Sequence, residues 1–264
     1  SLEPQVSPRA RAALRFPRDW QVENRRLVRA LRASAELYGA RLLEGAAVEG
    51  VRVVGGRARG VETAGGFYGA GAVVLAAGAW TSGVRLLVSE REGGAARDES
   101  ESHPSVEPVR GQMLCFRQPA GPGSFARHVV YGPRGYVVPR RDGRLLAGST
   151  TERAGFDCRV TEEGAASIRA RAEEVAPGVA ALALEDSWAG LRPRASDALP
   201  LIGESADVKN LFYATGYYRN GILLAPASGR IVADLLTRGA TNLAPRALTA
   251  FSPARRARAA AGSR

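Results

Sequence analysis

Residues 188–227, WAGLRPRASDALPLIGESADVKNLFYATGYYRNGILLAPA, decide the fold of this chain. Gly190-Leu191-Arg192-Pro193 predicts a turn, and Gly216-Tyr217-Tyr218-Arg219-Asn220-Gly221 predicts a second turn that opens an apolar helix. A guanidinium presents two parallel donors to a carboxylate. The unpaired N–H groups at a helix start favour negative charge nearby. The stretch therefore predicts a site that holds a carboxylate.

The composition is that of a soluble globular protein, with 45% hydrophobic and 24% charged residues. A length of 264 residues allows one large domain or two interleaved domains. We expect no membrane span, since no apolar run reaches about 18 residues, and a cytoplasmic location, since no signal peptide is visible. The chain starts at Ser1 and its only methionine is Met113, so we expect a partial or processed sequence.

The formal charge of +11 comes almost entirely from arginine, because Lys209 is the only lysine among 37 basic residues. An arginine-rich nucleic-acid binder is one interpretation. The arginines are scattered, however, and a net charge by itself indicates only nonspecific association. We therefore expect no nucleic-acid partner. Two isolated cysteines predict no disulfide framework. The two histidines lack metal-ligand spacing, so we assign no metal.

Three helices are predicted from apolar spacing, capping residues and glycine stops, over residues 24–38, 161–175 and 221–238. Strands are expected at 41–43, 47–54, 57–63 and 211–214, and a continuous apolar run at 72–76 predicts a buried parallel strand. A separate antiparallel sheet is expected from 112–116, 129–131, 136–139 and 145–148. Residues 89–104 are rich in Glu, Ser, Gly and Arg and predict a mobile loop, and a frayed tail is expected over 246–264.

No glycine-rich segment has the context of a dinucleotide-binding turn, which needs a strand before it and a helix after it. Gly121-Pro122-Gly123-Ser124-Phe125-Ala126 matches the letters, but a strand-like segment follows it. Gly69-Ala70-Gly71 precedes a strand. Both are predicted to be turns, and we expect the pyrophosphate-binding segment to lie outside this chain.

Five ordered motifs carry a family resemblance. They are VVLAAGAW (73–80), PVRGQML (108–114), YVVPRRDGRLLAGSTT (136–151) and the segments 188–203 and 214–226. With them the chain resembles the FAD-dependent amino-acid oxidases related to D-amino-acid oxidase, and most of all the glycine oxidases of the thiamine-biosynthetic type. The resemblance implies an α/β fold with an α+β substrate part, whose dinucleotide-binding segment would precede Ser1.

The implied architecture is two interleaved domains. A partial, Rossmann-like FAD-binding domain is expected from residues 1–88 and 187–245. A substrate domain with an antiparallel sheet is expected from residues 105–186.

Three catalytic residues follow from the resemblance. Arg192 is expected to anchor the substrate carboxylate beside the flavin, the alternative being a structural arginine in an ion pair. Tyr136 is implied as a second carboxylate donor, against an ordinary strand aromatic. Arg219 is implied to hold the substrate region or shield the flavin, or else to orient its own turn.

The resemblance also implies FAD as the cofactor. Ala77, Gly78 and Trp80 follow the buried strand at its carboxyl end, the edge at which open α/β sheets bind ligands. The helix start is implied to face the flavin's pyrimidine edge. The full set of implied cofactor-binding residues is Val48, Ala77, Gly78, Trp80, Gly216, Asn220, Gly221, Ile222 and Leu223. Tyr217 stands where histidine is common in the family, which puts the flavin environment in doubt.

The function implied is oxidation of glycine or another small amino acid. The Cα hydride passes to the flavin N5, the imine hydrolyses to a keto acid and ammonia, and O2 becomes H2O2. The protein supplies orientation and electrostatics, and no obligatory base is needed. A sarcosine oxidase, a D-amino-acid dehydrogenase that reduces a quinone, and a non-catalytic remnant unable to hold FAD remain alternatives. The expected partners are the amino acid and O2, and association of identical copies is left open.

Overall fold

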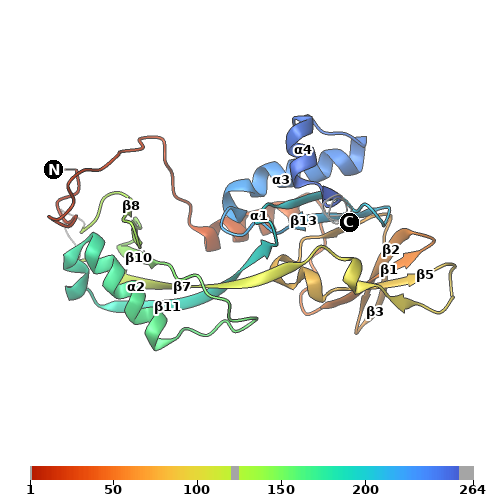
Figure 1. The fold of residues 1–264 in the computed structure, drawn as a ribbon, viewed down its shortest axis with the longest axis horizontal. Helices are drawn as coiled ribbons and strands as arrows, with labels where there is room; N and C mark the ends of the chain where they lie inside the picture. The colour runs from red at the N-terminus through yellow and green to blue at the C-terminus, as the bar shows by residue number, and fades with distance from the viewer. Residues whose placement is uncertain (1, 120–124, 256–264) are drawn as a thin grey trace, which may run out of the picture. The chain divides into compact units, whose positions relative to one another are not determined.

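The structure is a computed structural model that describes residues 2–119 and 125–255. It divides into two compact units, each built from two segments: unit 1 is Ser1–Leu27 with Arg110–Leu191, and unit 2 is Val28–Val109 with Arg192–Arg264 (Figure 1). Residues 1–27 were predicted to share one domain with residues 28–88 and 187–245. They belong to unit 1 because the Gln21 amide donates to the Pro139 carbonyl at 2.8 Å and Ser7 N–H donates to the Val175 carbonyl at 2.9 Å.

Unit 1 contains a five-stranded sheet in the order β11-β7-β10-β9-β8, in which β7, β10, β9 and β8 pair antiparallel as predicted. Its strands are β7 (Val106–Arg117), β8 (Val130–Tyr131), β9 (Tyr136–Pro139), β10 (Arg144–Gly148) and β11 (Leu184–Ala195). Helix α2 (Glu162–Val175) packs on β9 and β10. The Thr161 hydroxyl caps this helix by accepting from Gly164 N–H at 3.1 Å, as its sequence position predicts.

Strand β11 corrects one prediction. Residues 190–193 do not form a turn but lie inside this twelve-residue strand. Pro193 is tolerated there because β11 is the edge of its sheet, where a missing N–H leaves no partner unsatisfied. Of the predicted turn at 121–126, residues 121–124 lie outside the described part of the chain.

Unit 2 holds two sheets. The first has the order β3-β2-β1-β5-β6, with β1 and β5 parallel. The second is β12-β13-β4, with β4 and β13 parallel. The strands are β1 (Val48–Val54), β2 (Arg57–Thr63), β3 (Gly66–Gly69), β4 (Val73–Leu75), β5 (Arg85–Ser89), β6 (Arg97–Asp98), β12 (Leu201–Glu204) and β13 (Leu211–Thr215). Short 3₁₀ turns are η1 (Gly78–Gly83) and η2 (Ser100–Ser102) in this unit, and η3 (Pro177–Ala181) in unit 1.

One strand prediction in unit 2 is wrong. Residues 41–43 form no strand: the chain turns at Gly45, with φ of +75°, and Leu42 and Leu43 stay exposed. The segment predicted as a mobile loop, 89–104, carries β6 and η2, because Asp98 pairs with Leu87 of β5 and accepts from the Ser100 N–H. The predicted parallel strand at 72–76 is confirmed as β4, although Val74 is exposed.

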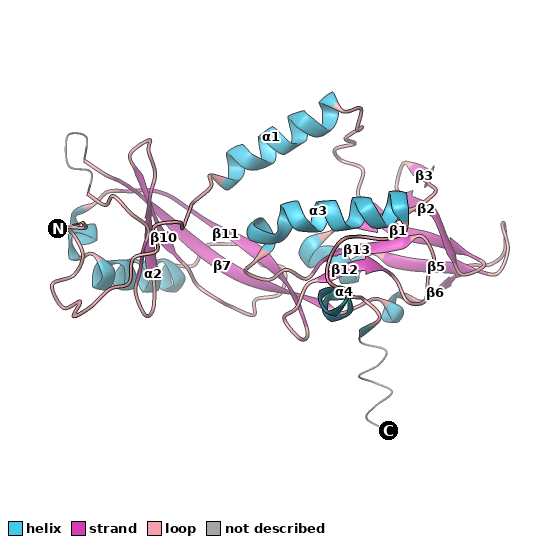
Figure 2. Cartoon of the chain, turned by 90° about the horizontal axis from the view of Figure 1, so that it is seen from above, coloured by secondary structure: helices cyan, strands magenta, loops and turns pink. Residues whose placement is uncertain are grey.

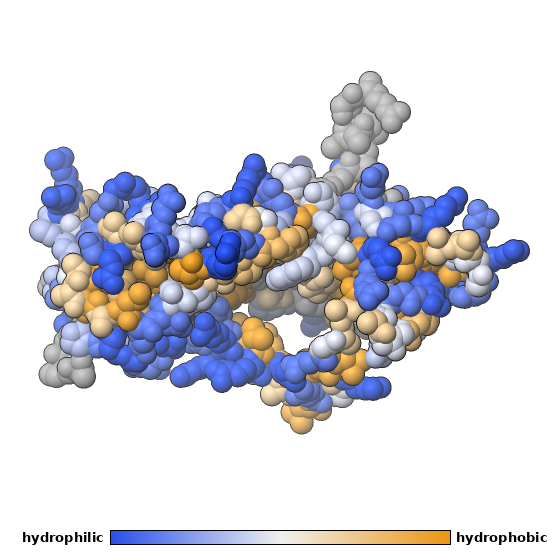
Figure 3. Space-filling model, turned by 90° about the horizontal axis from the view of Figure 1, so that it is seen from below, coloured by the Kyte–Doolittle hydropathy of each residue, from blue (hydrophilic) through white to orange (hydrophobic). Residues whose placement is uncertain are grey.

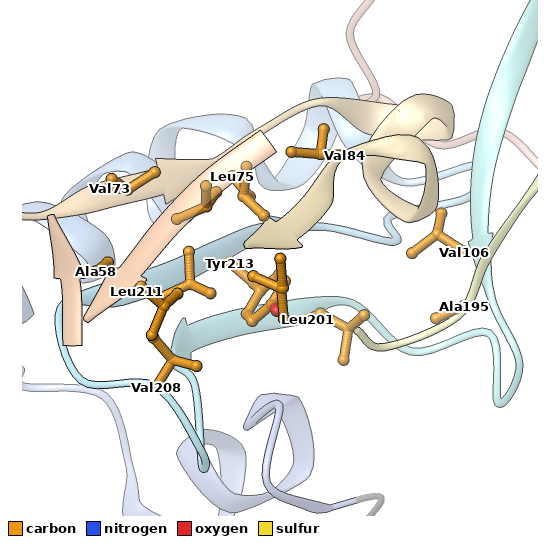
Figure 4. Packing of buried hydrophobic residues seen from close by; sticks show 13 residues of the cluster. Ala58, Val73, Leu75, Val84, Val106, Ala195, Leu201, Val208, Leu211 and Tyr213 are labelled. Atoms are coloured by element: carbon orange, nitrogen blue, oxygen red, sulfur yellow. The ribbon is translucent and has the colours of Figure 1, made fainter. Parts of the chain in front are cut away.

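The core of unit 2 lies between its two sheets and draws side chains from both, including Val51, Leu75, Leu86, Leu211 and Tyr213 (Figure 4). Helix α3 (Gly221–Arg238) covers β12 and β13 on their other side (Figure 2). It ends at Gly239, which takes the left-handed conformation as predicted.

Helix α4 (Pro245–Phe251) stands where a frayed tail was expected. Leu248 and Phe251 pack against the buried residues Ile202, Ile231 and Val232, so burial of apolar surface orders this segment.

Helix α1 (Asn24–Leu37) has the predicted amphipathic pattern but buries none of its residues. Val28 and Leu31 are more than half exposed. Figure 3 shows one face of the molecule, on which apolar patches interrupt a mostly hydrophilic surface. Within the described residues, no helix combines the length and the apolar character that a membrane crossing requires.

Candidate active site

The predicted site residues of unit 2 gather where β4 and β13 end. Because these strands are parallel neighbours, their carboxyl ends lie at the same edge. Thr215, the last residue of β13, is fully buried, and its hydroxyl contacts the Thr81 hydroxyl at 2.9 Å. Both hydroxyls approach the Gly78 carbonyl oxygen, at 3.2 Å and 2.7 Å. These contacts fix the start of η1 against the end of β13.

The glycines at this edge leave room for a ligand or a close backbone. Gly78 has φ of +55° and would have nothing within 4 Å of an added Cβ. Gly216 has φ of +75°, and an added Cβ would meet the Ala195 Cβ at 3.1 Å. A side chain at either position would be strained, because L residues rarely adopt these conformations.

The turn between β13 and α3 is held against the end of β11. Tyr218, with φ of +50°, donates from its backbone N–H to the Pro193 carbonyl at 2.7 Å. Arg194 and Tyr217 form an isolated antiparallel bridge beside it. The structure thus joins the segment that contains Arg192 to the Gly216–Gly221 turn.

The two predicted arginines differ in environment. Arg192 is half-buried on β11, whereas Arg219 is exposed on the turn. The neighbouring Arg194 is a structural arginine: it pairs with Glu107 at 2.6 Å, and its guanidinium lies 5.9 Å from the centre of the Tyr218 ring. Burial raises the pKa of the Tyr217 phenol, so this residue is neutral at the site.

Several exposed apolar side chains belong to the segments at this edge. Trp80 on η1 is 56% exposed, and Ile222 and Leu223 in the first turn of α3 are 49% and 77% exposed. The Asn220 side chain does not cap the helix, so the first N–H groups of α3 keep their outward dipole. Apolar side chains beside a helix N-terminus, with open space at Gly78, suit a flat, electron-accepting ring system such as a flavin.

Val48 belongs to the other sheet of unit 2. It is the first residue of β1. Gly50 of β1 pairs in parallel with Arg85, the first residue of β5, and β5 follows η1 in the chain. Ala77, half-buried, precedes η1.

Tyr136 lies in unit 1, on β9, and is half-buried. Its hydroxyl donates to the Met113 sulfur at 3.4 Å, and its ring lies 5.3 Å from that of Tyr131. Thr151, at the end of the third motif, is exposed.

Sequence reasoning missed several polar residues that shape these regions. Thr215 could have been found from its position at the end of the β13 segment, and Thr81 lies in η1, the turn that follows β4. Gln112 is fully buried under α2; its amide donates to Glu152 and Thr161 and accepts from the Thr161 N–H. Only the three-dimensional fold reveals this network, because its members are distant in sequence.

His103 is a second buried polar residue that the sequence did not single out. Its Nδ1 lies 2.8 Å from the Tyr213 hydroxyl, and burial lowers the pKa of the imidazole. Among the described residues, no group of three or more His, Cys, Asp and Glu side chains could hold a metal ion.

Parallel strands ending at a glycine-bearing edge, with a helix N-terminus beside it, define a nucleotide-cofactor oxidoreductase of the α/β class. The FAD dependent oxidoreductase (DAO) family matches residues 1–235, and the chain belongs to this family. FAD is therefore the cofactor to which its fold is adapted.

Named relatives agree with this assignment. The chain is 36% identical over 254 residues to glycine oxidase of Geobacillus kaustophilus, a match that covers 94% of this chain and 63% of the relative. It is 37% identical over 242 residues to the bifunctional protein ThiO/ThiG of Synechocystis, covering 90% of this chain and 34% of the relative. The chain thus spans less than two thirds of the length of these relatives.

Solved structures show the same fold. The crystal structure of glycine oxidase from Geobacillus kaustophilus matches with a TM-score of 0.72 at 34% identity, over 87% of this chain and 57% of that one. L-proline dehydrogenase from P. horikoshii matches with a TM-score of 0.74 at 25% identity, over 88% of this chain and 59% of that one. The predicted family and fold class are confirmed.

Proposed function

We propose that this chain forms the flavin-facing and substrate-facing part of an FAD-dependent oxidase that acts on glycine or another small amino acid. The observation that carries the proposal is the junction of β11 with the turn before α3. There the Tyr218 N–H binds the carbonyl of Pro193, the residue after Arg192, and the turn leads into the N-terminus of α3. A guanidinium and a helix N-terminus each suit an anionic group.

Arg192 would bind the substrate carboxylate through two parallel hydrogen bonds, which fix the orientation of the amino acid. Tyr136 would donate a further hydrogen bond from its hydroxyl. Arg219 would screen the outer side of the turn. Binding of the carboxylate by Arg192 would hold the Cα–H bond of the substrate in one direction.

FAD, when bound, supplies the two-electron acceptor for the Cα–H bond. Residues of unit 2 would hold it: Gly78 and Gly216 through close backbone approach, Trp80 and Leu223 through apolar contact. The first N–H groups of α3 would stabilise negative charge that develops on the ring. Val48, Ala77, Asn220, Gly221 and Ile222 complete the proposed cofactor contacts.

Glycine is the favoured substrate because relatives that carry this name align with most of the chain. The likeness to an L-proline dehydrogenase supports a second candidate, a dehydrogenase that passes electrons to an acceptor other than O2. Both candidates use the same carboxylate anchor, and they differ in the fate of the electrons.

The test uses the protein expressed from its complete gene and loaded with FAD. Glycine, sarcosine, D-alanine and L-proline are compared, with H2O2 formation measured in air and quinone reduction measured without oxygen. We expect glycine to give stoichiometric H2O2. Quinone reduction without H2O2 would establish the dehydrogenase instead. An FAD-loaded protein that oxidises none of the four substrates would refute the proposal.

A further inference from the structure

One row of residues runs across the sheet of unit 1 through four adjacent strands. Met113 on β7 pairs with Gly148 on β10, Gly148 pairs with Tyr136 on β9, and Tyr136 pairs with Tyr131 on β8. Side chains at paired positions stand on the same face of a sheet. The row therefore sets the only methionine of the chain on the same face as Tyr136.

Because Gly148 has no side chain, Met113 and Tyr136 can make direct contact. A Cβ at this position would lie 2.3 Å from the Met113 sulfur and 2.8 Å from the Tyr136 hydroxyl oxygen, so any side chain would push them apart. Across the gap the Tyr136 hydroxyl donates to the Met113 sulfur at 3.4 Å. The thioether is a weak acceptor, so this bond orients the Tyr136 hydroxyl but can be exchanged for a stronger hydrogen bond to the substrate.

Met113 is also accessible. It is half-buried, whereas its neighbours Gln112 and Leu114 are fully buried. A partly exposed methionine is a target for peroxide, which converts it to the sulfoxide.

We propose that Met113 is a peroxide-modified positioning residue, whose oxidation withdraws the Tyr136 hydroxyl from the substrate. The proposal rests on the proposed function in two respects: the oxidase supplies H2O2, and Tyr136 binds the carboxylate.

The chemistry balances without a further reactant. A sulfur lone pair of Met113 attacks one oxygen of H2O2 and the O–O bond breaks. The sulfur is oxidised to the sulfoxide, and the other oxygen leaves as water with both protons.

The product changes the hydrogen bonding of the row. A sulfoxide oxygen is a strong polar acceptor, unlike the thioether. In the space left by Gly148 it would compete with the substrate carboxylate for the Tyr136 proton. Substrate binding then loses the hydrogen bond from Tyr136 to the charged carboxylate. We therefore expect the substrate KM to rise about tenfold while kcat changes less.

The test supplies peroxide from outside, so that it does not depend on turnover. The protein is treated with H2O2, and peptide mapping by mass spectrometry follows the added oxygen at Met113, with the exposed Cys158 as an internal measure of treatment. Near-ultraviolet difference spectra, treated minus untreated, then report on the phenols. We expect oxidation of Met113 and a red-shifted phenol band, both reversed by methionine sulfoxide reductases.

Two variants separate positioning from general damage. Met113→Leu keeps a similar volume but has no sulfur, so peroxide should change neither its phenol spectrum nor its KM from their starting values. Tyr136→Phe should still gain oxygen at Met113 but show no spectral change.

Other outcomes overturn the inference. Oxidation of Cys158 with Met113 intact would show that the thioether is not a target. Oxidised Met113 without a phenol shift would show that it does not position Tyr136. If no amino acid is oxidised by the loaded protein, the proposed function fails, while the added-peroxide and spectral measurements still decide the link between Met113 and Tyr136.

Discussion

The backbone N–H of Tyr218 donates a 2.7 Å hydrogen bond to the carbonyl oxygen of Pro193. This bond joins the last residues of an edge strand to a turn that would otherwise be free to move. Arg192 precedes the acceptor, and the turn leads into the N-terminus of α3. The bond thereby ties the backbone next to Arg192, the proposed carboxylate anchor, to the turn before α3 within one unit.

The first prediction concerns the charge at this junction. Arg192→Leu should raise the KM for the amino acid by about ten- to a hundredfold, because a lost hydrogen bond to a charged group costs about 1.5–3 kcal/mol. Steady-state kinetics on the FAD-loaded protein measure this. Arg246→Leu, the same charge loss at an exposed position of α4, should leave KM unchanged. Equal kinetics for Arg192→Leu and the parent protein would remove Arg192 from the site.

Local patterns predicted most helices and the antiparallel sheet of unit 1. Residues 221–238 combine a glycine turn, apolar spacing and a glycine stop, and α3 has these bounds. The hairpin of β1 and β2 follows from Gly55 and Gly56, which both take positive φ. The local sequence is enough to predict such elements, because their turn residues and their apolar periodicity indicate the same structure.

The misassigned segments depend on partners far along the chain. Gly190 and Pro193 read as turn residues, yet they lie in an edge strand that needs no donor from the proline. Strand β6 is largely polar and forms only because β5 offers an open edge. In the candidate site, Arg192 stays a prediction from its motif, whereas the contact of Tyr136 with Met113 depends on strand register and could not be predicted from the sequence.

The second prediction tests the threonine pair beneath Gly78. Thr215→Val keeps the shape of the side chain but removes its hydroxyl, so Thr81 loses a buried partner while keeping its bond to the Gly78 carbonyl. We expect the free energy of unfolding to fall by about 1–2 kcal/mol and FAD affinity to weaken. Urea titration and flavin-fluorescence titration measure the two effects.

The control for this variant is Thr237→Val on α3, whose exposed hydroxyl donates to the Ala233 carbonyl within the helix. It should change the free energy of unfolding by less than about 0.5 kcal/mol. If both variants lose the same free energy of unfolding, the contact of Thr215 with Thr81 contributes no more to stability than an exposed hydroxyl on a helix.

The third prediction compares two helical glycines. Gly164 lies in the first turn of α2 against the buried Gln112, and an added Cβ would lie 2.3 Å from the Gln112 Nε2. Gly164→Ala should therefore destabilise the protein by about 1–3 kcal/mol, the usual cost of overpacking, even though alanine favours helices. Gly229→Ala on α3, where nothing lies within 4 Å, should stabilise it by about 0.5–1 kcal/mol. Chemical denaturation compares them, and a stabilised Gly164→Ala would contradict the packing described around Gln112.

The last prediction is a pH dependence of stability from His103. Burial lowers the pKa of its imidazole below the ordinary 6.5, against the opposing effect of the Val84 backbone and the Asp98 carboxylate. The unfolded chain therefore takes up a proton at a higher pH than the folded protein does. Stability from this residue is present above about pH 6.5 and is lost as the pH falls toward the lowered pKa of the folded state.

Urea unfolding at a series of pH values from neutral to mildly acidic measures this loss. The parent protein should lose free energy of unfolding more steeply on acidification than His103→Gln, which cannot titrate, whatever the starting stability of that variant. Tyr213→Phe removes the hydroxyl that contacts Nδ1 but keeps the imidazole buried. It should keep the steep pH dependence, because burial is the main cause of the lowered pKa. Parallel pH profiles for the parent and His103→Gln would mean that His103 does not govern acid stability.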